Sequence, residues 1–152
     1  MKLTAFADFG LRTLLLLAAS GERAWSSAEL AQHLQVSRDH LIKVIQRLAA
    51  GGYVRTARGA GGGVSLAVDP GSVRLGQVMA WMEQPQALVE CFRDDGGHCN
   101  LNPVCRLRGR LAAAERAFYA ELDRSTLAEC MHPGLRAYAR ADDQAAPAQS
   151  GC

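Results

Sequence analysis

Two short amphipathic segments, separated by a tight turn and followed by a glycine-rich hairpin, constrain the fold of this 152-residue chain more than any other feature. The first begins at Ser26, which stands three residues before Glu29 in the spacing of a capping box, and ends near Leu34. The second follows Ser37, a favourable N-cap, carries apolar residues at helical spacing and stops at residues 51–52, which are both glycine. Two helices joined in this way predict a helix-turn-helix unit.

The stretch after these helices is expected to form a β-hairpin. Two β-prone runs, residues 53–57 and 64–68, flank a glycine-rich tip that can adopt positive φ angles. The glycines could also form a phosphate cradle, but no Gly-Lys-Ser/Thr follows and the next element is a strand, which disfavours a nucleotide site. A hairpin directly after a helix-turn-helix unit predicts the wing of a winged helix.

Two further helices are expected to complete this domain. Apolar residues recur at helical spacing over residues 5–19, and residues 73–83 carry another such stripe, which Pro85 closes. Residues 1–84 are therefore predicted to form one winged helix-turn-helix DNA-binding domain. The expected fold class is mainly α with a small β-hairpin, to which a long dimerisation helix is added.

The evidence for that long helix is an apolar stripe near the end of the chain. The stripe recurs three and four residues apart from Val104 to Leu122, and no later segment is long enough to cover it. The simplest partner is the same helix of a second subunit, so a homodimer is expected. Residues 106–131 are assigned to this dimerisation helix and a short terminal helix, and the polar, Ala-rich residues 132–152 to a flexible tail.

Charge is distributed unevenly along the chain. Residues 1–80 hold nine Lys and Arg against five Asp and Glu, whereas residues 81–152 hold eight against ten. A basic N-terminal half suits contact with phosphates, although such an excess is also common on solvated surfaces. Asp8 and Arg12 interrupt the apolar N-terminal run, which argues against a signal peptide or a membrane span, and a cytoplasmic protein is expected.

Polar side chains at the start of the second helix of the helix-turn-helix avoid its apolar stripe. A recognition helix offers its N-terminal residues to base edges, and wing residues reach phosphates or the minor groove. The alternative is a solvated polar face, but the wing that follows favours DNA binding. The predicted contacts to double-stranded operator DNA come from Ser37, Arg38, His40 and Lys43 of the helix and from Arg55, Arg58, Gly62 and Gly63 of the wing.

Three of the five cysteines fall within the fifteen residues "CFRDDGGHCNLNPVC". Cys91, Cys99 and Cys105 lie in residues 85–105, an expected loop, and an odd number of thiols in a reducing compartment argues against a disulfide framework. Thiolates bind zinc and iron-sulfur clusters, and either centre needs a fourth ligand, for which His98 or a carboxylate from elsewhere is available. Unligated buried cysteines are the alternative.

The remaining polar residues assemble no catalytic site. No Ser-His-Asp order, pair of general acid and base, or cofactor fingerprint can be put together from them, so an enzyme is not expected. Cys130 occupies an apolar position of the short terminal helix and is expected to serve as a small core residue.

Three stretches of the chain resemble a known family. "MKLTAFADFGLRTLLLLA", "VSRDHLIKVIQRLAAGGYVRTARGAGGGVSLA" and "CNLNPVCRLRGRLAAAERAFYAELDRSTLAE" are similar to the iron-sulfur winged-helix bacterial repressors, most closely to the nitric-oxide-sensing members, over residues 1–130. The resemblance implies a homodimer whose cluster is held by Cys91, Cys99 and Cys105 with Asp8 of the partner subunit, and it favours a four-iron over a two-iron cluster. It also implies that nitric oxide attacks the cluster and lifts repression of detoxification genes.

Other functions stay open at this point. An iron-sulfur-status or general redox regulator of the same family would differ in its selectivity for nitric oxide over oxygen and peroxide. A zinc-stabilised DNA-binding module would use the metal for folding alone. An electron-transfer protein would usually supply four cysteines and would have no need of a wing.

Overall fold

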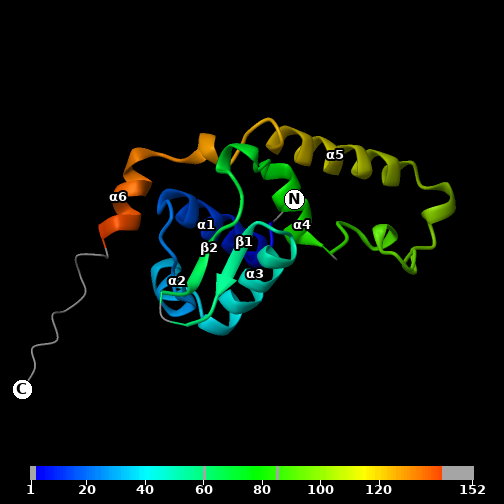
Figure 1. The fold of residues 1–152 in the computed structure, drawn as a ribbon. Helices are drawn as coiled ribbons and strands as arrows, with labels where there is room; N and C mark the ends of the chain where they lie inside the picture. Colours follow the sequence, from blue (N-terminus) through cyan, green and yellow to red (C-terminus); the bar gives the residue numbers. More distant parts are fainter. Residues whose placement is uncertain (1–2, 60, 85, 142–152) are drawn as a thin grey trace, which may run out of the picture.

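Helices account for most of the structure, a computed structural model that describes residues 3–59, 61–84 and 86–141. Figure 1 labels the elements in chain order, which are α1 (Ala5–Ala19), α2 (Ser27–Leu34), α3 (Arg38–Ala50), β1 (Val54–Ala57), β2 (Gly63–Leu66), α4 (Leu75–Glu83), α5 (Arg106–Leu122) and α6 (Pro133–Ala141). The predicted fold class, mainly α with a small β-hairpin in a winged helix-turn-helix, is confirmed.

The helix-turn-helix begins and ends at the residues that carry the sequence signals. The Ser26 backbone N–H donates to Glu29 Oε2 at 2.8 Å, and the Glu29 N–H donates to Ser26 Oγ at 3.1 Å, so the capping box of α2 is complete. Ser37 Oγ caps α3 by accepting from the His40 N–H at 3.3 Å. After α3, Gly52 adopts φ 77°, which leads the chain into β1.

The wing is an antiparallel pair whose register runs from Val54 opposite Leu66 to Ala57 opposite Gly63. Both strands are shorter than the β-prone runs of the sequence. Gly63, with φ 152°, lies so close to the chain at Trp25 that an added Cβ would stand 2.6 Å from the Trp25 carbonyl oxygen. Glycine is therefore required here by backbone packing, because Trp25 and Val64 form a bridge that ties the wing to the start of α2.

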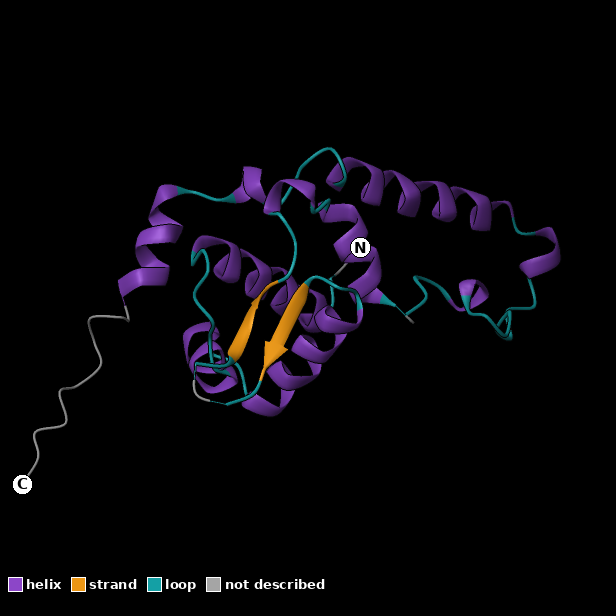
Figure 2. Cartoon of the chain, in the orientation of Figure 1, coloured by secondary structure: helices purple, strands orange, loops and turns teal. Residues whose placement is uncertain are grey.

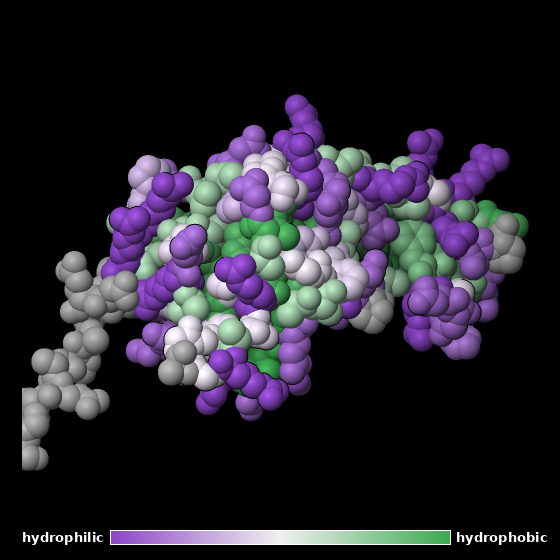
Figure 3. All heavy atoms as spheres, viewed as in Figure 1, coloured by the Kyte–Doolittle hydropathy of each residue, from purple (hydrophilic) through white to green (hydrophobic). Residues whose placement is uncertain are grey.

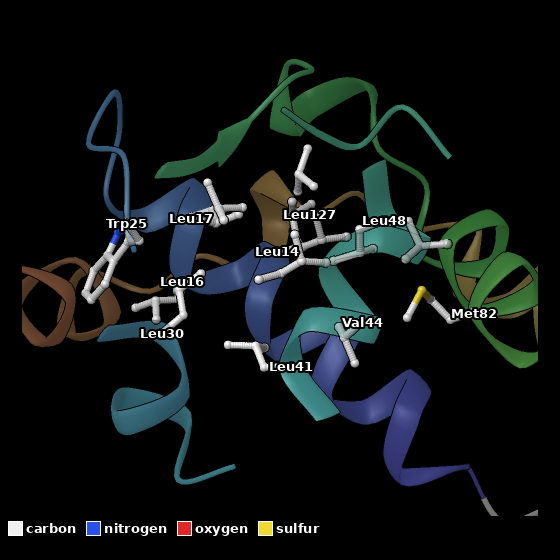
Figure 4. Close-up of a cluster of buried hydrophobic side chains, with 14 of the residues drawn as sticks. Leu14, Leu16, Leu17, Trp25, Leu30, Leu41, Val44, Leu48, Met82 and Leu127 are labelled. Carbon is white, nitrogen blue, oxygen red and sulfur yellow. The ribbon is translucent and has the colours of Figure 1, made fainter. Parts of the chain in front are cut away.

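α1 lies at the centre of the domain and packs against both α3 and α4. Leu14 and Leu17 of α1 are fully buried and meet Leu41 and Leu48 of α3 in one apolar cluster (Figure 4). Val78 of α4 belongs to the same cluster. Full burial of each such side chain contributes about 1.5–3 kcal/mol, so this cluster fixes α3 against α1.

α5 extends away from the winged domain as an arm. Its C-terminal part lies against α4, and its N-terminal end runs outward together with residues 86–105 (Figures 1 and 2). Within the described residues, no side chain of α5 is buried. Leu101, Val104 and Leu107, near the far end of the arm, are 66%, 81% and 62% exposed, and Figure 3 shows apolar atoms there. Large apolar side chains exposed together are typical of an interaction surface.

Residues 133–141 form α6, although the sequence indicated a flexible tail over residues 132–152. α6 covers part of α1 and buries Ala139. The Tyr138 ring lies 4.4 Å from the His33 ring of α2, and its hydroxyl donates to the His33 carbonyl oxygen at 3.3 Å. The other residues of the predicted tail, 142–152, lie outside the described part of the chain. None of the described helices is long and apolar enough to cross a membrane.

Candidate functional site

The N-terminal end of α3 presents a polar surface to solvent. Ser37, Arg38 and Lys43 are all exposed, and Arg38 Nε donates to Ser27 Oγ of α2 at 3.4 Å. This weak bond leaves most of the guanidinium available. All three side chains are therefore open to solvent at the N-cap and in the first half of α3, and their contacts with DNA stay predictions.

His40 lies on a different side of α3. Its ring meets Phe6 and Phe9 of α1 edge-on, with ring centroids 5.9 and 5.4 Å apart. Its Nε2 is buried and has no hydrogen-bond partner among the described residues. His40 as a whole is half-buried, so its contact with DNA stays a prediction. The pattern of α3 alone does not reveal these ring contacts, because Phe6 and Phe9 belong to α1.

The wing carries two exposed arginines. Arg55 of β1 donates through Nε to Ser65 Oγ of β2 at 2.9 Å, a contact across the hairpin, and Arg58 follows β1 at the tip. Glycine is required at Gly62 because an added Cβ would stand 2.5 Å from the Ala57 carbonyl oxygen. The arginines are available for phosphates, whereas the glycines shape the turn that carries them.

The three clustered cysteines lie on the segment that joins α4 to α5. Cys91 is in the 3₁₀ turn Glu90–Phe92, Cys99 is in the loop that follows, and Cys105 stands immediately before α5. All three thiols are free and partly buried. They therefore lie on the connection between the winged domain and the arm, clear of the apolar core.

Hydrogen bonds from the backbone shape the loop between the first two of these cysteines. The Gly97 N–H donates to Asp95 Oδ1 and the His98 N–H to Glu90 Oε1, each at 3.0 Å. The pKa of the Asp95 carboxyl lies below its ordinary value because the Gly97 amide donates to it, and the positive charge of Arg93 lowers it further. At φ 60°, Gly97 is in the left-handed region, which favours glycine.

Among the residues that the structure describes, no three His, Cys, Asp or Glu side chains come together in a group that could hold a metal ion. The chemistry of the donors nevertheless fits a soft metal centre, since three free thiols share one short segment. Cys105 also lines a groove of about 550 Å³ with Phe92 and Asn102. It immediately precedes the first turn of α5, whose N–H groups have no partner inside the helix.

The sequence patterns did not indicate the arginines at the start of α5 as site residues. Arg106, Arg108 and Arg110 are exposed, and no acidic residue occupies the first turn of this helix. Positive charge is unfavourable at a helix N-terminus. The Arg108 guanidinium carbon lies 6.0 Å from the centroid of the Phe92 ring, in the groove that Cys105 also lines. Basic residues in a first helical turn are the signal that could have indicated an anionic group nearby.

The two candidate ligands other than cysteine are Asp8 of α1 and His98, the neighbour of Cys99 in the chain. Asp8 is on the outer side of α1, where its carboxylate pairs with Arg12 one turn later, at 2.7 Å from Nη2 and 3.0 Å from Nε. His98 is exposed in the cysteine loop. Neither side chain joins the thiols in a metal-binding group within the described chain.

Cys130 is not the core residue that the sequence indicated. It is exposed in the 3₁₀ turn Ala128–Cys130. The buried apolar position of this region is taken by Leu127, which is 1% exposed and whose N–H donates to the Val73 carbonyl oxygen at 2.9 Å. The turn is too short for a helical apolar stripe, and Cys130 points to solvent as a result.

Comparison with known proteins identifies relatives of this arrangement. The sequence model of the Rrf2 family, described as an iron-dependent transcriptional regulator, matches residues 3–133. The chain is 41% identical over 128 residues to the HTH-type transcriptional regulator NsrR of Bacillus subtilis (strain 168). This alignment covers 84% of this chain and 88% of that protein.

Solved structures show the same fold. CymR, the global cysteine regulator of B. subtilis, matches with a TM-score of 0.63 at 26% identity, over 84% of this chain and 93% of that one. IscR of T. potens matches with a TM-score of 0.64 at 21% identity, over 99% of this chain and 94% of that one. The family match runs from before α1 to the start of α6, and it thus includes the winged domain, the cysteine segment and α5. The chain is a transcriptional regulator and belongs to the Rrf2 family.

Proposed function

We propose that this protein is a homodimeric repressor that binds operator DNA under the control of an iron-sulfur cluster, with a four-iron cluster favoured. Nitric oxide releases the repressor by reacting with the cluster, and genes of nitric-oxide detoxification are then expressed. The observation that carries this proposal is the position of three free thiols on the one segment that joins the winged domain to α5. The similarity to NsrR supports it.

DNA binding is assigned to the exposed polar end of α3 and to the wing. Arg38 and Lys43 reach base edges or phosphates from the recognition helix, and Arg55 and Arg58 reach phosphates from the wing. Because each neutralised phosphate releases a counterion, binding weakens as salt rises, with a slope of log K of about −0.9 per contact. Two such surfaces in a dimer read half-sites about 34 Å apart.

The dimer is assigned to α5 and the end of the arm. Leu101, Val104 and Leu107 are exposed in the single chain, and a twofold axis along α5 would bury the same surface of both subunits. An isologous contact of this kind sets the spacing between the two recognition helices. A change in the arm therefore changes the fit to DNA.

Cys91, Cys99 and Cys105 would hold the cluster together with Asp8 of the partner subunit, and His98 is the alternative fourth ligand. When bound, the cluster supplies the irons with which nitric oxide reacts. Within one subunit, the Asp8 carboxylate forms an ion pair with Arg12 at 2.7 Å. The Asp8 carboxylate can therefore either pair with Arg12 or bind the cluster of the partner subunit. This exposed pair, worth about 0.2–0.5 kcal/mol, gives Asp8 a partner when it is not a ligand.

The test is a measurement of iron, sulfide and zinc in protein purified without oxygen, with a visible absorption spectrum and a titration with nitric oxide. Iron and sulfide with a visible band that nitric oxide bleaches, followed by loss of DNA binding, are expected. A colourless zinc protein whose DNA binding ignores nitric oxide would refute the proposal and leave the zinc-stabilised module.

An iron-sulfur-status or general redox regulator of the same family is the second candidate. The partly buried state of all three thiols leaves the segment open to small oxidants as well as to nitric oxide. Parallel titrations with oxygen and hydrogen peroxide separate the two. A response to peroxide or oxygen at lower doses than to nitric oxide would favour this alternative.

A further inference from the structure

Three consecutive residues in the last turn of α4 each contact a different part of the winged domain. Trp81 contacts α3, Met82 fits against the middle of α1, and Glu83 binds the start of α1. This turn is also where the winged domain ends, since the cysteine segment, residues 86–105, begins shortly after it. One helical turn therefore touches both the recognition helix and α1 on the way to the thiols.

Trp81 and Arg47 form a reciprocal clamp between α4 and α3. The Trp81 indole N–H donates to the Arg47 carbonyl oxygen at 2.9 Å. Arg47 donates in return to the Trp81 carbonyl oxygen, from Nε at 3.1 Å and from Nη2 at 2.6 Å, and its guanidinium carbon lies 3.8 Å from the centroid of the indole. That carbonyl is one of the last four of α4, which have no partner inside the helix. The clamp thus joins the C-terminal ends of both helices through three hydrogen bonds and a cation–π contact.

The space at the clamp is closely filled. An added Cβ at Gly51, which ends α3, would stand 2.6 Å from Trp81 Nε1. The indole therefore cannot shift toward α3 without moving the end of that helix. Arg47 is also held with its guanidinium turned to α4, which separates it from the exposed arginines assigned to DNA.

Met82 and Glu83 join α4 to α1, the first by packing and the second by hydrogen bonds. Met82 is 2% exposed, and an added Cβ at Gly10 would stand 2.5 Å from its methyl carbon (Figure 4 shows Met82 among the buried side chains). Glu83 Oε1 accepts from the Thr4 N–H at 2.9 Å and from its hydroxyl at 3.3 Å. Thr4 is the N-cap of α1, so Glu83 fixes the turn that leads to Asp8.

We propose that Trp81, Met82 and Glu83 are the coupling element of this regulator, and that Arg47 is the positioning residue through which the state of the cysteine segment reaches the recognition helix. The inference rests on the proposed function and adds the residues that connect the cysteine segment to the recognition helix. A displacement at the start of the cysteine segment acts on the end of α3 through the Trp81–Arg47 clamp and on the start of α1 through Glu83. Close packing transmits such shifts instead of absorbing them.

The test uses two conservative substitutions that weaken the clamp differently. Trp81→Phe keeps an aromatic ring and removes the indole N–H, and Arg47→Met keeps the length of the side chain and removes its donors. Arg23→Gln is the matched control, because Arg23 stacks at 4.0 Å on Trp25 in the same domain but away from α4. Each full-length variant is prepared with its cluster and without it. The probe is a DNA duplex selected from a random pool by the cluster-loaded wild-type protein.

The quantity of interest is the ratio of the two Kd values, cluster-free over cluster-loaded. Both clamp variants are expected to lower this ratio by about tenfold, within the usual range of coupling between sites. Iron and sulfide content should stay at the wild-type level, and Arg23→Gln should keep the wild-type ratio. Amide hydrogen exchange at residues 47–53 should differ between the two states of the wild-type protein and no longer differ in Trp81→Phe.

The outcomes separate this inference from the proposed function. If the wild-type ratio is large and both clamp variants retain it, the coupling role is overturned while the proposed function stands. If the wild-type protein binds DNA equally well with and without its cluster, the proposed function fails and the coupling role with it. A clamp variant that unfolds or loses its cluster also counts against the inference, because the turn would then be structural support only.

Discussion

Gly76 lies in the first turn of α4 where α5 crosses it, and Gly76→Ala is expected to lower the free energy of unfolding. An added Cβ would stand 2.1 Å from the Tyr119 carbonyl oxygen and 2.6 Å from Asp123 Oδ1. Because the carbonyl belongs to the backbone of α5, that helix has to retreat by about 1 Å to restore even a 3.0 Å separation. Overpacking of this kind costs about 1–3 kcal/mol. The movement also strains the 2.8 Å hydrogen bond from the Gln77 N–H to Asp123 Oδ1.

Gly109→Ala is the matched control for this experiment. The substitution is the same and the site is also helical, but nothing lies within 4 Å of the added Cβ. Alanine favours the helix by up to about 1 kcal/mol over glycine, so this variant should be more stable than the wild type. Urea unfolding of the cluster-free proteins at one fixed protomer concentration measures both. A Gly76→Ala protein as stable as Gly109→Ala would refute the close approach of α4 and α5.

Substitutions in the wing, the cysteine segment and α2 test other parts of the structure. Arg58→Gln should weaken DNA binding and reduce the salt slope by about one, whereas Arg124→Gln, just after the end of α5, should change neither, as measured by fluorescence anisotropy in a salt series. Cys99→Ala should abolish the cluster and leave the Tm near that of the cluster-free wild type, because the thiol lies outside the core; a protein that unfolds instead would favour structural zinc. The pKa of Glu29 is lowered, chiefly by the Ser26 hydroxyl that donates to it, so its stabilising contribution is complete above its ordinary pKa of 4.5 and is lost as the pH falls below that value. Urea unfolding of Glu29→Gln should therefore show a weaker loss of stability below pH 4.5 than the wild type does.

The elements of the winged domain could be predicted because their signals are local. The limits of α1, residues 5–19, and the caps at Ser26 and Ser37 follow from side chains that act within one helical turn. The hairpin likewise follows from two β-prone runs and a glycine tip. These features depend little on the rest of the chain, which is why they survive in the folded structure.

The features that the sequence did not reveal depend on contacts between distant segments. His40 is polar and lies near the start of α3, yet Phe6 and Phe9 of α1 pack edge-on against its ring. The requirement for glycine at Gly63 comes from the backbone of Trp25, which is far away in sequence. Residues 133–141 look polar, but α6 needs only a narrow apolar side to lie on α1. In each case the partner, and not the residue itself, decides the role.

The cysteine segment was predicted as a set of donors but not as a geometry. Spacing identifies Cys91, Cys99 and Cys105 as thiols on one loop, whereas their convergence depends on what the loop binds, because metal binding and local folding are coupled. The hydrogen bonds from Gly97 and His98 order one part of this loop without bringing the thiols together. The chemistry of such a site is therefore predictable at the level of ligand type alone.

Two unfavourable features of the single chain occur at the same end of the arm. Arg106 and Arg108 lie at the N-terminus of α5, where the helix dipole disfavours positive charge, and no acidic side chain of the first turn offsets them. Val104 and Leu107 expose large apolar side chains to water around the same turn. Cys105 stands between them and lines the groove beside Arg108. An anionic cluster on the thiols would relieve the charge, and a partner subunit that covers the apolar side chains would relieve the exposure. The proposed dimer with a cluster beside Arg108 would therefore relieve both features at one place.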